Sequence, residues 1–507
     1  MRKFLLLISS LVVLITLTAC GGGEKETKLK DTLVVAQGAD AKSLDPHASN
    51  DQPSSRVSAQ IYSGLVSTDV DMNIVPALAE SWDQPNSTTT IFHLRKGVKF
   101  HNGEELKASD VKFTIEEMLA SPTVHHIIEA VDKVEVVDDY TVKIITKEPF
   151  GPLLHHLAHT ASSILNEKAV TEAGDDYGQH PVGTGPYAFV KWDSGDQIVL
   201  KANENYFLGA PKVKNVIFRN ITEGTNRTIS LETGEVDIAY DIEPIDKNQV
   251  KDNENLNLIE EESLSMAYIG FNFEKAPFDN KLVRQAIGHA IDVDIIIDVV
   301  LDGAGSKANS PIGPKVFGYD KDAKSYEYDP ELAKKLLAEA GYPNGFKTTI
   351  WTNDNPVRLQ IATIVQDQLK QVGIEMAVEP VEWGAYLDGT ARGDHEMFIL
   401  GWVTTTGDAD YGLNALFNSA NIGGAGNRSF YGNRDVDKWL DKAKSSTDPK
   451  ERLELYAKIQ KQIMEDLPVD PLYYQTMNAG INKDVKGFKL NPAGHHKIYG
   501  VYFDQQK

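Results

Sequence analysis

Cys20 is the only cysteine among the 507 residues, so no disulfide within the chain can stabilise its fold. Stability must come from hydrophobic cores, and a chain of this length can build several of them. Apolar residues make up 41% of the sequence and charged residues 24%, which are the proportions of a globular protein. The length predicts two or three domains.

The segment before Cys20 has the pattern of a bacterial lipoprotein signal. Two basic residues precede the apolar stretch Phe4–Leu17, and the small residue Ala19 stands immediately before the cysteine. The stretch is shorter than the roughly 20 apolar residues of a membrane-spanning helix. We therefore expect residues 1–19 to be a signal peptide, Cys20 to carry a lipid, and residues 20–30 to form a flexible tether. The alternative is an ordinary signal peptide that happens to contain a cysteine.

The net charge of the chain is strongly negative. It is −22 for the whole sequence and becomes −24 once the two basic residues of the signal are removed. Such a surface repels nucleic acid and anionic lipid headgroups, because phosphate contacts need clustered Lys and Arg. No second apolar segment of membrane-spanning length occurs, so we expect an extracytoplasmic protein that meets the cell membrane only through the lipid on Cys20.

Helical and strand patterns alternate along the chain, which predicts a mixed α/β (α+β) fold. Asp329 and Pro330 mark the start of a helix that ends at Gly341, and further helices are expected over about 357–372 and 449–466. Strands are expected where β-branched and aromatic residues gather, namely at Thr32–Ala36, Thr90–Leu94, Thr141–Thr146, Asn215–Ile221, Tyr268–Phe273, Thr348–Trp351 and Met397–Trp402.

Several sequence segments occur in an order and spacing that resemble one family. They are Phe92–Gly103, Ala108–Phe113, Pro181–Tyr187, Pro277–Ala286 and Gly341–Phe346. From about residue 32 to the C-terminus the chain is similar to the peptide-binding family (solute-binding protein family 5) of ABC-importer extracellular receptors. That family includes dipeptide, oligopeptide, nickel, haem and glutathione receptors.

The resemblance implies a clam of two α/β lobes that closes over a peptide. Its hinge would lie near Gly270–Phe273 and Ala479–Asn482. It also implies a monomer without a cofactor, whose partners are a small peptide ligand and the permease and ATPase subunits of the importer. The expected parts are lobe I at 31–270, with an extra subdomain at about 60–185 and completed by 481–507, and lobe II at 271–480.

One segment narrows the resemblance to a branch of the family. Gly401–Leu413 is similar to the glutathione-binding receptors, and Gly341–Asn353 points the same way. In dipeptide receptors of the family an aspartate three residues after the Gly-Trp tryptophan holds the ligand's ammonium, whereas this chain has Thr405 there. The resemblance therefore implies capture of glutathione or a related peptide. A dipeptide or oligopeptide receptor and a nickel-chelate or haem receptor are the alternatives.

Glutathione carries one ammonium and two carboxylates, so its pocket needs paired charges. For the ammonium we expect Asp408 or Asp410, near the hydroxyl-rich stretch of Thr404, Thr405 and Thr406. A turn-stabilising role is the alternative for Asp408. For the carboxylates, Arg358 and Arg428 are candidates, because a guanidinium fork suits a carboxylate; a solvated position on a helix is the alternative for Arg358.

Further contacts are expected from aromatic and loop residues. Trp351 and Trp402 can pack on ligand methylenes, or can belong to the core. The loop of Asn50, Asp51 and Gln52 lines the cleft in the family.

Two other patterns suggest chemistry that the rest of the chain does not support. Ser109–Lys112 matches S-x-x-K, but the partner motifs of acyl-enzymes do not occur, and an N-cap at Ser109 or Asp110 explains the stretch. We therefore expect no enzyme. His155, His156 and His159 form H-H-x-x-H in a segment expected to be a peripheral helix, without a companion acid or cysteine at metal-ligand spacing, so no metal site is predicted.

Overall fold

The computed structural model describes residues 30–504 except 50, 354, 424 and 425. The predicted signal peptide, Cys20 and nearly all of the predicted tether lie outside these residues. The predicted helices are confirmed as α10 (Pro330–Glu339), α11 (Pro356–Lys370) and α15 (Pro449–Asp466). Asp329 caps α10 by accepting a hydrogen bond from the backbone N–H of Leu332.

The body of lobe I carries strands from both ends of the chain and packs around two cores, one that includes Leu33, Val35, Phe218 and Tyr240 and a smaller one that includes Leu231 and Val250. Its elements are β1 (Thr32–Gln37), α1 (Gln52–Ile61), β8 (Tyr187–Asp193), β9 (Gln197–Ala202), β10 (Asn215–Asn220), α6 (Gly224–Glu232), β11 (Ile238–Tyr240), α7 (Lys247–Asp252), β18 (Val485–Lys486) and β19 (Tyr502–Phe503).

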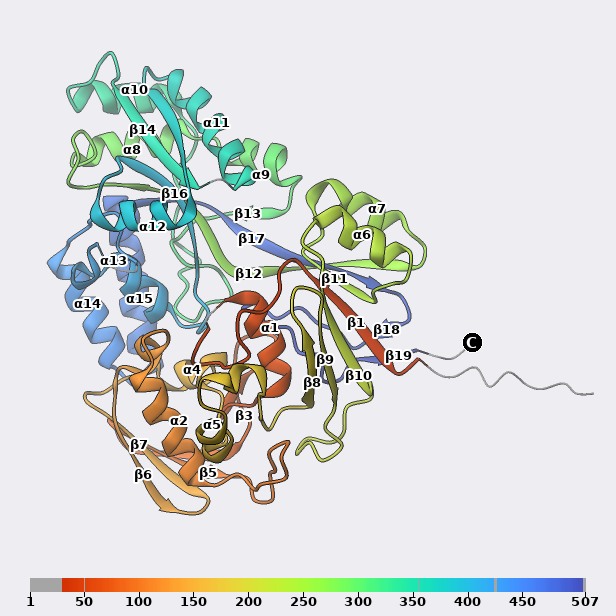
Figure 1. Ribbon diagram of the computed structural model, residues 1–507. Coiled ribbons are helices and arrows are strands. Elements are labelled where there is room, and N and C mark those ends of the chain that lie inside the picture. The colour runs from red at the N-terminus through yellow and green to blue at the C-terminus, as the bar shows by residue number, and fades with distance from the viewer. Residues whose placement is uncertain (1–29, 50, 354, 424–425, 505–507) are drawn as a thin grey trace, which may run out of the picture.

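A smaller subdomain is inserted in lobe I and has its own four-stranded sheet, ordered β4-β5-β7-β6, and its own core. It occupies the lower part of Figure 1. Its elements are β2 (Val66–Thr68), β3 (Ile74–Pro76), β4 (Ala79–Asn86), β5 (Thr89–Leu94), α2 (Ala108–Ala120), α3 (His125–Ile128), β6 (Val131–Asp138), β7 (Thr141–Thr146), α4 (Leu153–Leu157) and α5 (Glu167–Ala173).

One predicted cap in this subdomain is wrong. Helix α2 begins at Ala108, so its N-cap is Lys107 rather than Ser109 or Asp110. Asp110 instead lies one turn inside, where its carboxylate accepts a hydrogen bond from the backbone N–H of Lys107 at 2.9 Å. This reciprocal arrangement satisfies a donor at the helix start and needs no catalytic role for the residue.

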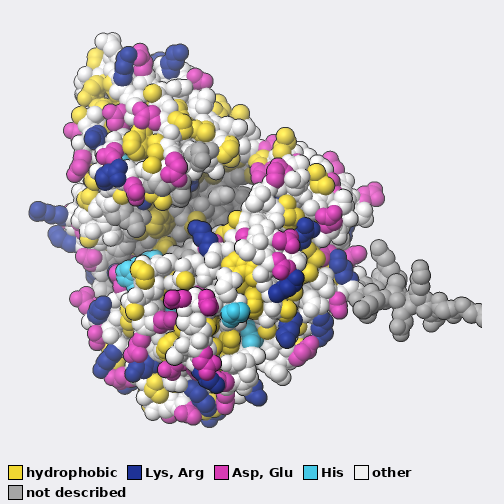
Figure 2. Space-filling view, in the orientation of Figure 1, with side chains coloured by type: hydrophobic (Ala, Val, Ile, Leu, Met, Phe, Trp, Pro, Cys, Tyr) yellow, Lys and Arg dark blue, Asp and Glu magenta, His cyan; other side chains and the backbone are white. Residues whose placement is uncertain are grey.

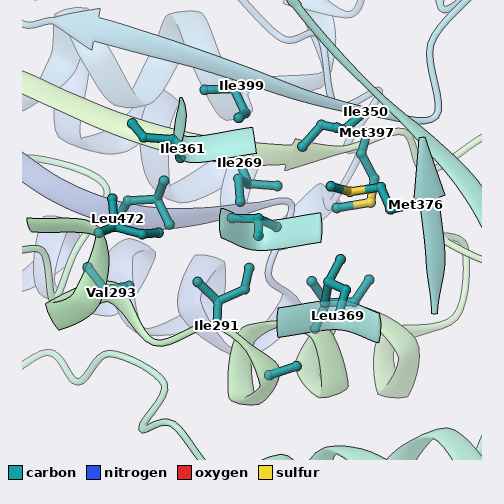
Figure 3. Packing of buried hydrophobic residues seen from close by; sticks show 14 of the residues in the cluster. Ile269, Ile291, Val293, Ile350, Ile361, Leu369, Met376, Met397, Ile399 and Leu472 are labelled. Atoms are coloured by element: carbon teal, nitrogen blue, oxygen red, sulfur yellow. The ribbon is translucent and has the colours of Figure 1, made fainter. Parts of the chain in front are cut away.

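Lobe II has helices on both faces of its sheet, which gives it two cores. Figure 3 shows the first of them, where Ile361 and Leu369 pack with Ile350 and Met397. The remaining elements of the lobe are α8 (Lys281–Ala290), α9 (Val293–Leu301), β13 (Gly305–Lys307), β14 (Lys347–Asn353), β15 (Glu375–Val381), α12 (Trp383–Arg392), β16 (Met397–Val403), α13 (Ala409–Phe417) and α14 (Arg434–Ser445).

Two long strands, β12 (Leu256–Phe271) and β17 (Val469–Asn482), pass from one lobe into the other and pair with each other. They join the strands of both lobes into one sheet, ordered β15-β14-β16-β12-β17-β11-β1-β10-β9-β8, with β13 on β17. Figure 1 shows this pair running from the sheet of lobe II at upper left toward β11 and β1 at the right. The pairing is interrupted in the middle, where three residues after Glu262 face the single residue Gln475.

The predicted fold class, a two-lobed mixed α/β clam with an extra subdomain, is confirmed by this arrangement. The lobe boundaries at 270/271 and 480/481 stay predictions. Within the residues that the structure describes, no helix is both long and apolar enough to cross a membrane.

Candidate ligand-binding cleft

A cavity of about 320 Å³, here called the cleft cavity, lies between the lobes. Its floor is formed by the crossing strands β12 and β17. One wall holds Asp241 and Glu243, which follow β11, and the other holds Asn355, Arg358 and Gly401 at the ends of β14 and β16. Both walls are thus formed where parallel strands end at their carboxyl side, which is the usual position of ligand sites in α/β sheets. Figure 2 shows the surface hollowed between the two masses.

The end of β16 offers backbone groups to this cleft. On one side β16 pairs with β12 up to Val403, but on the other side β14 reaches only Met397 and Phe398. The edge of Gly401–Val403 that faces away from β12 therefore has no strand partner in the described part of the chain. An extended peptide can add to such an edge through main-chain hydrogen bonds.

Arg358 projects from the first turn of α11 into the cleft cavity. Asn355 caps this helix by accepting a hydrogen bond from the Arg358 N–H at 3.0 Å, and the guanidinium Nη1 donates to Asn353 Oδ1 at 3.0 Å. Gly401 is a neighbour of this guanidinium, because a Cβ built there would lie 3.8 Å from Nη2. Arg358 is half-buried, which strengthens its interaction with an anion compared with bulk water.

The opposite wall carries an ion pair that sequence analysis did not anticipate. Arg56 Nη1 donates to Asp241 Oδ2 at 2.9 Å, and the guanidinium lies 4.8 Å from the centre of the Tyr240 ring. Burial favours the neutral acid, but the charge of Arg56 outweighs it and holds the pKa of Asp241 below its ordinary value. Asp241 follows β11 and Arg56 lies on α1, so no local sequence pattern links them.

Asp408 lies in a buried network and does not face the cleft cavity. Its carboxylate accepts two hydrogen bonds from Arg452, at 2.8 and 2.7 Å, and one from the Tyr456 hydroxyl at 3.3 Å. It also caps α13 by accepting from the Asp410 N–H. Burial would raise the pKa of Asp408, but the Arg452 charge reverses this and lowers it. The charge and the hydrogen bonds of Asp408 are therefore taken up by other residues of the protein and not by a ligand in the cleft cavity.

Asp410 is buried two residues further along, in the first turn of α13. It accepts a hydrogen bond from Asn414 Nδ2 at 2.6 Å, and burial raises its pKa to about 6. Its Oδ2 is 3.8 Å from His156 Nε2, while His155 Nδ1 is 3.5 Å from Asp408 Oδ2. Helix α4 of the subdomain therefore packs on the start of α13 in lobe II through two histidine–aspartate contacts.

The three threonines lead from β16 to a second cavity. Thr404 and Thr406 are buried, and Thr406 Oγ1 accepts from the Asp408 N–H. The Oγ1 of Thr405 is buried as well and lies close to the Tyr411 side chain. Thr405 and Thr406 line a cavity of about 210 Å³ between the subdomain, lobe I and this loop, here called the subdomain cavity. It also includes His159 and Lys497, which sequence analysis did not single out as ligand contacts.

The other predicted site residues lie around these cavities or behind them. Arg428 is buried behind the sheet and donates to Leu387 O and Thr390 Oγ1 at 2.6 and 2.5 Å. Trp402 packs toward α13, with its ring centre 5.8 Å from that of Tyr411, and its indole N–H has no partner. Trp351 packs against α12 at Gly389.

The predicted loop of lobe I is partly described. Asp51 caps α1 by accepting from the Ser54 N–H at 3.1 Å, and Gln52 Nε2 donates to Ala493 O at 3.1 Å. Asn50 lies outside the described residues. These contacts tie the start of α1 to the C-terminal segment, and neither residue lines the two cavities described above.

Two of the three histidines in the H-H-x-x-H motif lie inside the protein. His156 and His159 are buried, so the segment is not peripheral as predicted, because α4 is covered by α13. In the described part of the chain no three or more His, Cys, Asp or Glu side chains come together as a metal-binding group.

A protein with two lobes around a cleft, and with an unpaired strand edge in that cleft, has the architecture of a binding receptor. Residues 73–424 match the bacterial extracellular solute-binding proteins, family 5 Middle. The chain belongs to this family and is an extracytoplasmic solute-binding receptor of an ABC importer, not an enzyme.

Named relatives share most of the chain. The glutathione-binding protein GsiB of Pectobacterium atrosepticum is 36% identical over 475 residues, which cover 90% of this chain and 91% of that protein. Among solved structures, the periplasmic binding protein DppA of Helicobacter pylori, in complex with the peptide STSA, is 34% identical with a TM-score of 0.81 and covers 94% of this chain and 99% of that one. HbpA2 of Haemophilus parasuis is 31% identical with a TM-score of 0.85, at 93% and 99% coverage.

The Asp408–Arg452 pair gives a first prediction. Changing Arg452 to Met leaves a fully buried carboxylate without its cation, which typically costs about 3–5 kcal/mol. We expect urea denaturation to show a loss of this order in the free energy of unfolding. The matched control is Lys334→Met, which removes the exposed Lys334–Glu331 pair and should cost less than about 1 kcal/mol. Equal effects of the two changes would contradict the structural role of Asp408.

Buried histidines predict a loss of stability in mild acid. Burial lowers the pKa of His101, His156 and His395 to about 4, and of His159 and His496 to about 3. In the unfolded chain these histidines bind protons near pH 6.5, whereas in the folded protein they remain neutral until the pH is much lower. Their contribution to the free energy of unfolding is therefore complete above about pH 6.5 and is lost as the pH falls toward 4. Each histidine contributes at most about 2 kcal/mol between pH 6.5 and 5.

Two buried carboxyls act in the opposite direction. Burial raises the pKa of Asp410 to about 6 and that of Asp470 to about 7, so their contribution is present below about pH 4 and is lost as the pH rises through these values. Because burial lowers the pKa of more histidines than the number of carboxyls whose pKa it raises, urea unfolding should give a lower free energy at pH 5 than at pH 7. A protein equally stable at both values would contradict the prediction.

Proposed function

We propose that this receptor captures glutathione or a closely related short peptide and delivers it to its permease, while a lipid on Cys20 holds it at the cell membrane. The observation that carries the proposal is the edge of β16 at Gly401–Val403, which has no strand partner among the described residues and begins at Gly401 in the lining of the cleft cavity. A dipeptide or oligopeptide receptor, or a receptor for a nickel chelate or haem, is the alternative.

The peptide is expected to bind as an added strand. Backbone groups of Gly401–Val403 would pair with the amides of the ligand, which gives affinity for peptides of different sequence. Gly401 has no side chain to obstruct this approach, and Arg358 lies beside it. A ligand carboxylate at that end of the strand would meet the guanidinium fork, which can form two parallel hydrogen bonds with it.

The other end of the ligand would reach Thr405. A carboxylate at this position would repel the α-carboxylate that the γ-glutamyl group of glutathione carries next to its ammonium, whereas a hydroxyl can accept from the ammonium or donate to the carboxylate. We assign Asp408 and Asp410 to the support of this loop, because Arg452 and Asn414 already occupy them. Arg428, which is bound to α12, supports the wall in the same way.

Names of relatives support the choice of ligand. The relatives at 34–36% identity include glutathione-binding proteins of several enterobacteria, and they share about nine tenths of this chain. Solved structures of similar shape include one in complex with the peptide STSA and one in complex with Met-Leu.

Closure of the clam is expected to bend the two crossing strands. The pairing of β12 with β17 is interrupted between Glu262 and Met266, so fewer ladder hydrogen bonds resist bending there. We propose this point as the hinge, in place of the ends of the strands near Gly270–Phe273 and Ala479–Asn482. Ligand that contacts both walls would favour the closed state.

Titration calorimetry tests the ligand. Reduced glutathione, oxidised glutathione, a mixture of dipeptides and nickel are each titrated into the protein, and we expect a glutathione form to bind with a submillimolar or lower Kd. Arg358→Met should weaken this binding about 10- to 100-fold, because a charge-assisted hydrogen bond contributes about 1.5–3 kcal/mol. Arg392→Met, which alters an exposed arginine paired with Asp394, is the matched control and should bind like wild type. Binding of dipeptides alone would refute the glutathione assignment, and binding of nickel alone would favour the metal receptor.

The lipid anchor is tested separately by Cys20→Ser. The variant should be released from cells while its soluble form binds ligand with the affinity of the wild type, because Cys20 precedes the predicted tether. Cell fractionation and calorimetry measure the two properties. Retention of the variant at the membrane would contradict the anchor.

A further inference from the structure

The subdomain cavity differs in charge from the protein that contains it. The sequence has 73 Asp and Glu residues against 51 Lys and Arg. Within the described part of the chain no acid lines this cavity, whereas Lys497 does. The lining also has the hydroxyl groups of Ser67, Thr405 and Thr406 and the rings of Tyr62 and Tyr206. Such a lining suits a small organic group that bears a negative charge.

Lys497 is the one Lys or Arg among the described residues that line this cavity, and burial lowers its pKa from the ordinary value. Burial lowers the pKa of His159 to about 3 and holds the pKa values of His155 and His495 below their ordinary value, so these rings are neutral at pH 7. Neutral imidazoles can still donate or accept hydrogen bonds.

The ammonium of Lys497 is held by neutral oxygens. Its Nζ donates to Ser67 Oγ at 2.5 Å and to Thr68 O at 3.3 Å. No described carboxylate lies within ion-pair distance of it; Asp69 acts on it only from further away and accepts from Asp71 and Asn73 instead. An ammonium has three donors, so a third N–H is available to an incoming anion.

The two cavities lie at opposite ends of one short segment. Gly401 lines the cleft cavity beside Arg358, and Thr405 lines the subdomain cavity. At about 3.3 Å per residue the four steps from Gly401 to Thr405 span at most about 13 Å. An extended tripeptide spans about 10 Å. A tripeptide bound along this segment would therefore bring its ends to the two cavities.

We propose that the subdomain cavity is a carboxylate subsite in which Lys497 binds the carboxylate of the ligand's γ-glutamyl end, while Arg358 binds the glycyl carboxylate. The assignment rests on the proposed function. It adds that the receptor selects ligands that carry a second carboxylate. Thr405 also lines this cavity, next to the end of β16. Pairing each carboxylate with its own cation lowers the cost of taking both out of water.

Calorimetry with two ligands tests the subsite. The ligands are reduced glutathione and 4-aminobutyryl-cysteinyl-glycine, which lacks only the carboxylate of the γ-glutamyl group. The wild type should bind glutathione at least about tenfold more tightly than the analogue. In Lys497→Met this preference should vanish because glutathione binding weakens, whereas Lys497→Arg should keep most of it. Lys489→Met, an exposed lysine of the same C-terminal segment that lines neither cavity, is the control and should keep the full preference.

The outcomes separate the two proposals. If the wild type binds glutathione and Lys497→Met keeps the preference for it, the subsite is wrong and the proposed function stands. If Lys497→Met weakens both ligands equally, Lys497 has a general role and the subsite is also wrong. If the wild type binds neither ligand but binds α-dipeptides, the glutathione function fails and the subsite fails with it. Thermal unfolding of each variant checks that the fold is intact.

Discussion

The pairing of β12 with β17 is the constraint on which the rest of the structure depends. Each strand belongs to both lobes, so one ladder continues from Asn482 at one end to Val469 at the other. Because the strands are continuous, the carboxyl ends of β1, β11, β14 and β16 are held facing the same gap, and the interruption after Glu262 weakens the ladder between the lobes. The cleft is therefore a consequence of how the sheet is connected.

The cleft has a second support away from the crossing strands. The subdomain meets lobe II where α4 packs on α13, and the backbone of Gly151 donates to Lys444 O at 2.9 Å. The buried Asp408–Arg452 pair stiffens the lobe II side of this contact and holds the loop of Thr404–Thr406 in place. Acidic residues that could bind an ammonium thus serve as a framework, and hydroxyl groups and backbone form the surface in front of them.

Local patterns predicted the elements well, and contacts between distant residues were beyond them. Capping residues and apolar periodicity correctly indicated α10, α11 and α15, because these signals act within a few residues. The same local reasoning left two roles open for Asp408, contact with the ligand or stabilisation of a turn. Its partner Arg452 is 44 positions away, and a solvated helix-face arginine and a buried one have the same local sequence. Arg56 with Asp241 and Lys497 with Ser67 pair across even longer separations.

Charge distribution connects these observations to the choice of ligand. A receptor with a net charge of −22 attracts cations and repels a peptide with two carboxylates over most of its surface. Such a ligand is retained only where the acidic groups are paired internally or absent, and both cavities meet this condition in different ways. In the cleft cavity Asp241 is paired with Arg56 and Glu243 lies 3.8 Å from Arg227, while Arg358 lines the opposite wall; the described lining of the subdomain cavity contains no acid. Specificity for an anionic peptide can therefore arise on an acidic protein without a large basic patch.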